Sequence, residues 1–200
     1  MNTLNKQKNK NQKGFGLAEL VVVLLILAII IVLALPQLIS SRRLFRFSGL
    51  QRQISATLRD TRQEAMSQRT AITLRYDDTN KTMIVYGGSF GALGDAKNPI
   101  MPMSGDGLTA DEIVYGRPAG APVAALGDGS NLTALSSNAV EIVYQPDGSV
   151  INSSNIPQNR ALFFYDPKTP ADTAFAVSVL GAGGRVKIWR YSSGVNAYVE

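Results

Sequence analysis

The sequence predicts an α+β fold in which one long amino-terminal helix packs on antiparallel β-sheet. Residues 15–35 form an apolar run, and residues 44–69 carry an apolar stripe with helical spacing. From residue 70 onward, apolar and polar residues alternate in short segments that are typical of β-strands. A chain of 200 residues therefore has room for one membrane span and one modest domain with its own core.

The apolar run over residues 15–35 predicts a transmembrane helix. It contains sixteen Phe, Leu, Ile or Val residues and one charged residue, Glu19. A helix of this length rises about 30 Å, which is the thickness of a hydrocarbon core. The apolar side chains favour insertion by about 5 to 10 kcal/mol, whereas a carboxylate costs about 2.5 to 3.5 kcal/mol at the centre of a span and less near its end. Insertion is therefore favoured, and Glu19 is expected to need a partner.

The sequence GFGLAEL around Glu19, after a lysine-rich leader, resembles the class III signal of type IV prepilins and type II secretion pseudopilins. The resemblance implies that prepilin peptidase cleaves between Gly14 and Phe15, removes residues 1–14 as a cytoplasmic leader, and methylates the new amino terminus. It also implies that Glu19 neutralises the terminal amine of a neighbouring subunit in a filament. Pro36 lies where many of these proteins have a proline that loosens the helix.

Two simpler interpretations of this run are open. A secretory signal peptide has an apolar region of roughly 7 to 15 residues followed by a small-residue cleavage site, but this run is longer and ends in Leu-Pro-Gln-Leu. A plain signal anchor for a periplasmic domain explains the length of the run. It does not explain why Gly14, Phe15 and Glu19 occur together.

The helix is expected to continue over residues 36–69 as an amphipathic segment, because the helical pattern resumes after Pro36. The apolar positions recur every three or four residues, at Phe47, Leu50, Ile54, Leu58, Thr61 and Ala65. Eight arginines against two acidic residues give residues 42–75 a net charge of +6. These arginines suit a solvated helix face. Alternatively, Arg42, Arg43 and Arg46 lie near anionic lipid headgroups or against a neighbouring subunit.

Residues 70–200 are expected to form a β-rich domain. The period-two segments predict strands over residues 70–76, 82–86, 111–115, 139–144, 149–151, 161–165, 172–180 and 185–191. Residues 87–138 are rich in Gly, Ala, Pro, Ser and Asp. Such a stretch in a compact domain predicts a variable surface loop or an exposed hairpin.

Two further stretches resemble the GspH/FimT family of minor pseudopilins and pilins. One runs from Leu58 through Glu-Ala-Met to Arg69 and leads into a strand, and the other is the final pair of strands with its glycine turn before Arg185. The resemblance implies a pilin-like fold and a non-enzymatic subunit of a type IV pilus or type II secretion filament, active in filament initiation, protein secretion or pilus biogenesis. The implied partners are prepilin peptidase, other pilins or pseudopilins, and an inner-membrane assembly platform.

The formal net charge of +5 is mostly a property of the leader, whose four lysines leave +1 for residues 15–200. The positive-inside rule barely decides the orientation of the span, because the four lysines before it compete with Arg42, Arg43 and Arg46 after it. The prepilin resemblance implies a single pass through a bacterial inner membrane, with the leader in the cytoplasm. The carboxyl-terminal domain is then in the periplasm or in an extracellular filament.

Enzymatic function is not expected from the composition. The chain has no Cys and no His, which excludes the usual zinc sites and His-based catalytic triads. Its carboxylates are scattered over expected turns without a recognisable catalytic pair, so an anchored periplasmic enzyme is the less favoured alternative. We expect no metal and no cofactor.

The final strand suggests a second alternative, a pilus-tip DNA receptor for DNA uptake. Alternation places four residues of this strand on one exposed face, namely Arg185, Lys187, Trp189 and Tyr191. Arg190 lies in the same strand, and the candidate DNA-binding residues are Arg185, Lys187, Trp189 and Arg190. Cations mixed with aromatic rings suit single-stranded nucleic acid. Some FimT-like minor pilins carry Gly-Arg-x-Arg here, but this chain has Lys at the last position and loses its second guanidinium. The net charge of −4 over residues 76–200 instead favours a solvated face or a subunit contact.

Overall fold

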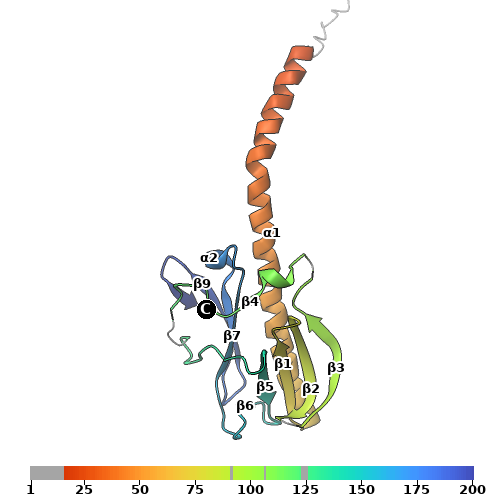
Figure 1. Ribbon diagram of the computed structural model, residues 1–200, viewed down its shortest axis with the longest axis vertical. Coiled ribbons are helices and arrows are strands. Elements are labelled where there is room, and N and C mark those ends of the chain that lie inside the picture. Colours follow the sequence, from red (N-terminus) through yellow and green to blue (C-terminus); the bar gives the residue numbers. More distant parts are fainter. Residues whose placement is uncertain (1–15, 91, 106, 123–125) are drawn as a thin grey trace, which may run out of the picture. The chain divides into compact units, whose positions relative to one another are not determined.

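The computed structural model describes residues 16–90, 92–105, 107–122 and 126–200. It confirms the α+β fold, with a long helix followed by strands in two antiparallel sheets (Figure 1). The chain divides into two compact units, residues 1–41 and residues 42–200.

Helix α1 (Leu17–Gln68) has 52 residues and begins in the first unit. Its segment Leu17–Ala34 is long and apolar enough to cross a membrane, and none of it is buried against the described protein. The helix continues through Pro36 without a break in its assignment. That Pro36 loosens the helix remains a prediction.

In the second unit, α1 buries the apolar stripe that the sequence predicts. All six of its expected positions are buried: Phe47, Leu50, Ile54, Leu58, Thr61 and Ala65. The helix ends at Gln68, and Arg69 adopts a left-handed conformation with φ of 53°. This conformation turns the chain out of the helix and into the first strand.

The first sheet has the strand order β3-β2-β1-β5-β6, and its strands pair antiparallel. Its members are β1 (Ile72–Asp77), β2 (Thr82–Ser89), β3 (Ala92–Pro102), β5 (Ala139–Tyr144) and β6 (Val150–Ile151). The predicted hairpin between β1 and β2 is confirmed. In its turn, the Asp77 carboxylate accepts a hydrogen bond from the N–H of Thr79 at 2.8 Å.

The second sheet has the order β10-β9-β8-β7-β4 and is also antiparallel. Its members are β4 (Val114–Tyr115), β7 (Arg160–Tyr165), β8 (Phe175–Val179), β9 (Val186–Ser192) and β10 (Ala197–Val199). Two short helices precede β4 and β8, namely the 3-10 helix η1 (Ala110–Glu112) and α2 (Pro170–Thr173). Helix α2 occupies the start of the strand that the sequence predicts over residues 172–180.

The main core joins α1 to both sheets, which lie beside the second half of the helix in Figure 1. Among its fully buried side chains are Ile54 and Leu58 of α1, Leu74 and Ile142 of the first sheet, and Leu162 and Val177 of the second. Side chains that alternate with these in β7 and β8 point to the other face of the second sheet. There a smaller cluster contains Leu126, Ala161, Phe163, Ala176 and Trp189.

The composition of residues 87–138 predicts a variable surface loop or an exposed hairpin, and the described part of the region forms a hairpin of β2 with β3 rather than one long loop. The region contains β3, which pairs with β2 along the edge of the first sheet, and also η1 and β4. An edge strand hydrogen-bonds on one side only and therefore tolerates Gly and Pro, which β3 contains. The pairing of β2 with β3 has two register shifts, so β3 lacks the strict alternation that marks a strand in a sequence.

Candidate functional site

The prepilin-type site predicted at the amino terminus lies only partly within the described residues. Gly14 and Phe15 are outside them. Glu19 is exposed in the first turn of α1, where its N–H donates to the carbonyl of Gly16 at 3.0 Å. Within the part of the chain that the structure describes, its carboxylate has no ion pair. The pairing of Glu19 with a neighbouring subunit stays a prediction.

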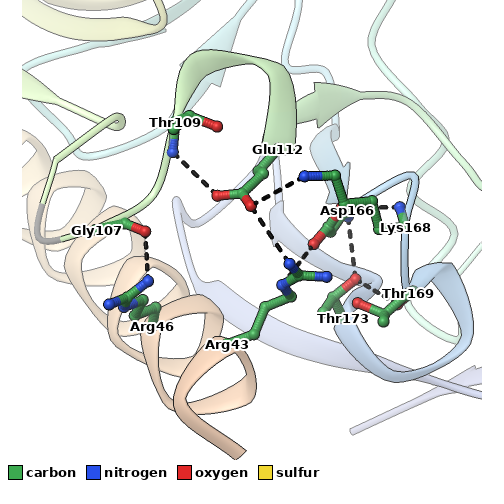
Figure 2. A network of polar contacts seen from close by, with 9 residues as sticks. All are labelled: Arg43, Arg46, Gly107, Thr109, Glu112, Asp166, Lys168, Thr169 and Thr173. Carbon is green, nitrogen blue, oxygen red and sulfur yellow. Dashed lines mark hydrogen bonds and ion pairs between the residues drawn. The ribbon is translucent and has the colours of Figure 1, made fainter. Parts of the chain in front are cut away.

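A second polar site lies in the domain, where four charged side chains form what we call the polar clamp: Arg43, Glu112, Asp166 and Lys168 (Figure 2). Arg43 Nε lies 3.3 Å from Asp166 Oδ2, and Arg43 Nη2 donates to Glu112 Oε1 at 3.5 Å. Lys168 Nζ donates to the same Glu112 oxygen at 3.5 Å. The clamp thus ties α1 to η1 and to the loop that follows β7.

Asp166 is the most buried member of the clamp, with a side chain that is 0% exposed. Its Oδ1 accepts a hydrogen bond from the N–H of Lys168 at 2.8 Å, and its own N–H donates to Thr173 Oγ1 at 3.0 Å. Its Oδ2 has no hydrogen bond and faces Arg43. A buried carboxylate is expensive without a compensating charge, and the Arg43 guanidinium supplies that charge beside Asp166.

Glu112 is the point at which the cations of the clamp meet. The N–H of Thr109 donates to Glu112 Oε2 at 3.1 Å and is the largest cause that lowers the pKa of Glu112. Burial opposes this shift, and the charges of Lys168 and Arg43 lower the pKa further. The ionised carboxylate is therefore the form that the folded domain stabilises.

Acid is expected to weaken this contact. Because the pKa of Glu112 is lower in the folded protein than its ordinary value of 4.5, its contribution is complete above about pH 4.5 and is lost as the pH falls through the folded-state value. The free energy of unfolding should therefore fall less in Glu112→Gln than in the wild type between about pH 6 and pH 3. Denaturant unfolding of the full chain in detergent at several pH values measures this.

The matched control for this experiment is Glu141→Gln. Glu141 faces Arg75 at 3.6 Å on the more exposed surface of the first sheet. Its variant should follow the wild-type pH dependence more closely than Glu112→Gln does. An identical acid response in the wild type and in Glu112→Gln would contradict the prediction.

Among the arginines at the start of the domain, Arg42 and Arg46 are exposed, as a solvated helix face predicts, whereas Arg43 is half-buried. Arg43 is only 23% exposed within the polar clamp, and Arg46 Nη1 donates to the carbonyl of Gly107. These two guanidinium groups therefore contact their own domain, and the expected contact with lipid headgroups or a neighbouring subunit stays a prediction. The local sequence gave no signal for these contacts, because the partners lie more than sixty residues away along the chain.

The expected exposed aromatic face of the last strand is wrong at Trp189. The Trp189 side chain is 6% exposed, and its indole N–H donates to Ser178 Oγ at 2.9 Å. Alternation does place it on the same face as Lys187, but the smaller core cluster, with Leu126, covers that face. Lys187 lies 5.2 Å from the Trp189 ring and pairs with Glu200. Other side chains of the domain therefore cover Trp189, which is the largest aromatic ring of the surface that the DNA-receptor alternative needs for base stacking.

The structure also separates the cations of the last strand. Arg190 Nη2 donates to Ser48 Oγ at 3.5 Å beside α1. Arg185 instead lines an open hollow that Arg59 and Arg62 of α1 share. The four residues predicted for DNA binding, Arg185, Lys187, Trp189 and Arg190, thus do not form one continuous exposed surface.

Comparison with known proteins bears on the amino terminus. Residues 9–35 match the prokaryotic N-terminal methylation motif, which includes Gly14, Phe15 and Glu19. This amino-terminal segment is type IV prepilin-like. The motif implies processing by prepilin peptidase, assembly with other pilins and a membrane anchor.

Two solved structures resemble the chain, and both are crystal forms of the type IV minor pilin FimU from Pseudomonas aeruginosa strain PAO1. The first has 17% sequence identity and a TM-score of 0.45, and the match covers 71% of this chain and 87% of that one. The second has 17% identity and a TM-score of 0.41, with 70% and 90% covered. No curated protein matches the chain.

Proposed function

We propose that the protein is a non-enzymatic minor pilin or pseudopilin, a subunit of a type IV pilus or type II secretion filament in the bacterial inner membrane. The observation that carries this proposal is the methylation motif at residues 9–35, which contains the unburied apolar segment Leu17–Ala34. A segment of this kind needs an apolar environment outside its own chain, either lipid or a bundle of similar helices.

The proposed mechanism begins with cleavage after Gly14, which frees the amine of Phe15. The apolar half of α1 is stored in the membrane and then moves into the helical bundle of a filament. In that low-dielectric bundle, the Glu19 carboxylate gains the terminal amine of a neighbouring subunit as its partner. A subunit that lacks this pairing would bury an uncompensated charge, so Glu19 favours entry in the correct register.

The domain contributes a compact folded unit to this subunit. The main core joins α1 to both sheets, and the polar clamp adds ion pairs between Arg43 and two later segments. Residues 42–200 therefore form one compact unit. We infer that this unit presents the subunit's specific contact surfaces, in the periplasm or on an extracellular filament.

The intact mass of the protein tests this function when membranes come from cells with and without prepilin peptidase. We expect the loss of residues 1–14 and the gain of one methyl group on Phe15 only when the peptidase is present. In the same cells, Glu19→Gln should be cleaved but should reduce the protein's share in sheared filaments by at least about tenfold, because a buried pair is broken.

Asp60→Asn is the matched control, since Asp60 is an exposed carboxylate on the same helix. It should leave both processing and filament content unchanged. An uncleaved chain in both cell types would refute the proposal and favour a plain signal anchor.

A further inference from the structure

Three arginines gather around an open hollow between α1 and the turn that precedes β9, and we call this hollow the arginine groove. Its volume is about 950 Å³. Its lining residues on α1 are Arg59, Arg62, Gln63, Met66 and Ser67, and those of the turn and β9 are Gly183, Gly184, Arg185 and Val186. The groove lies wholly within the second unit.

Within the part of the chain that the structure describes, no ion pair neutralises the charge of the arginine groove. Across the described ranges, neither Arg59, Arg62 nor Arg185 forms an ion pair, whereas Arg43 and Arg75 do. No carboxylate is among the residues that line the groove. Three guanidinium groups with no compensating charge repel one another, so an anionic group in the groove would be stabilised by all three.

Arg62 is held in place at this site. It is half-buried, and its Nε donates to the carbonyl of Gly148 at 3.3 Å. Gly184 has φ of +59°, and a Cβ added there would lie 2.8 Å from Arg62 Cδ and 2.1 Å from the Gly148 oxygen. The turn can therefore approach the Arg62 side chain this closely only because residue 184 is glycine. The Nη groups of Arg62 have no hydrogen bond within the described residues, and they remain available to a ligand.

The chemistry of the arginine groove suits carboxylates beside an apolar side chain. Guanidinium groups bind carboxylates with paired N–H···O bonds, and a guanidinium that is already oriented loses less entropy on binding. Met66 and Val186 add apolar surface between the charges.

A nucleic acid fits the arginine groove less well. No aromatic ring lines it for base stacking. A polyanion longer than a Debye length, about 8 to 10 Å, would also interact with the rest of the domain. Residues 42–75 and 76–200 carry net charges of +6 and −4, so the domain without the three groove arginines has a net charge of −1 and does not attract such a ligand. A short acidic segment interacts mainly with the groove itself.

We propose that the arginine groove binds an acidic segment of a neighbouring filament subunit, with at least two carboxylates flanking an apolar side chain. The identity of the neighbour rests on the proposed function, whereas the carboxylate chemistry rests on the groove. The contact would fix which subunit lies against the end of α1 and the β8–β9 turn.

The test is a fluorescence anisotropy titration of the full chain in detergent micelles with the labelled peptide Asp-Leu-Glu-Asp-Leu-Glu. We expect binding at low ionic strength that weakens as salt is added. The double variant Arg59→Gln and Arg185→Gln should lose at least about tenfold in affinity, because charged hydrogen bonds are removed. The matched control is Arg42→Gln with Arg52→Gln, which removes two exposed arginines of α1 outside the groove.

Several outcomes would overturn the proposal. They are no binding of the peptide, equal binding of its Asn-Leu-Gln-Asn-Leu-Gln counterpart, and equal losses in the groove and control variants. Tighter binding of a single-stranded oligonucleotide of equal charge, lost in the groove variant, would assign the site to nucleic acid instead.

An experiment in cells tests separately whether the segment that binds the groove belongs to a neighbouring filament subunit. If the proposal holds, the groove variant is cleaved normally but its share in sheared filaments falls, while the control variant keeps its share. If the groove variant kept its share in sheared filaments, the proposal that a filament subunit occupies the groove would be wrong. Failure of cleavage in the wild type would instead refute the proposed function, and the peptide titration would still decide the chemistry of the groove.

Discussion

Replacing Arg43 with alanine is expected to lower the free energy of unfolding of the domain by about 3 kcal/mol. The change would leave the fully buried Asp166 carboxylate without the guanidinium that lies 3.3 Å from its Oδ2. It would also remove one of the two cations that contact Glu112. Urea unfolding of the full chain in detergent measures this, with the fluorescence of Trp189, the single tryptophan, as the signal.

Arg42→Ala is the matched control, because Arg42 is exposed one residue earlier on the same helix. Its effect should stay within about 0.5 kcal/mol. Adding Asp166→Asn to Arg43→Ala should recover part of the lost stability, because the unpaired buried charge is then removed. Equal effects of Arg42→Ala and Arg43→Ala would show that the polar clamp does not stabilise the fold.

The parts of the fold that the sequence predicts are those set by local periodicity. The helical stripe requires only the spacing of residues such as Ile54 and Leu58, and both are buried as expected. The central strands β1, β5 and β8 bury apolar side chains in sequence-local patterns. A pattern of this kind is visible because each residue's environment repeats with the period of its own element.

The features that the sequence does not reveal depend on which segments meet. Strand β3 exists because β2 offers it an edge, not because its own residues favour a strand. Likewise, nothing near Arg43 in the sequence indicates Glu112 or Asp166 as partners. Contacts of this type become predictable only when the strand order is known.

Trp189 shows the same limit within the last strand. Period-two alternation assigns the side chain to a face of β9, but it does not indicate what covers that face. Leu126 and Phe163 cover Trp189, and they come from segments well before it in the chain. The DNA-receptor alternative assumed an open face and therefore overestimated the aromatic surface. Arg185 remains exposed, but it lines the arginine groove together with Arg59 and Arg62.

Leu58→Ala is expected to destabilise the domain by about 2 to 5 kcal/mol. Leu58 is 0% exposed in the main core, where α1 meets side chains of both sheets such as Leu74 and Leu162. Truncation removes three carbon atoms from this contact and leaves a cavity that sheets fixed on both sides of the helix can fill only partly. The same urea unfolding experiment measures the loss.

Leu44→Ala makes the same chemical change on the same helix and provides the control. Leu44 is 42% exposed, so its truncation should cost less than about 1 kcal/mol. If Leu58→Ala were no more destabilising than Leu44→Ala, the second half of α1 would not be an integral part of the domain core. The compact unit proposed for filament contacts would then lack its main support, because the other contacts of α1 with the rest of the domain, such as those of Arg43, Arg62 and Glu64, are polar. A large difference between the two variants would instead show that α1 and both sheets unfold together.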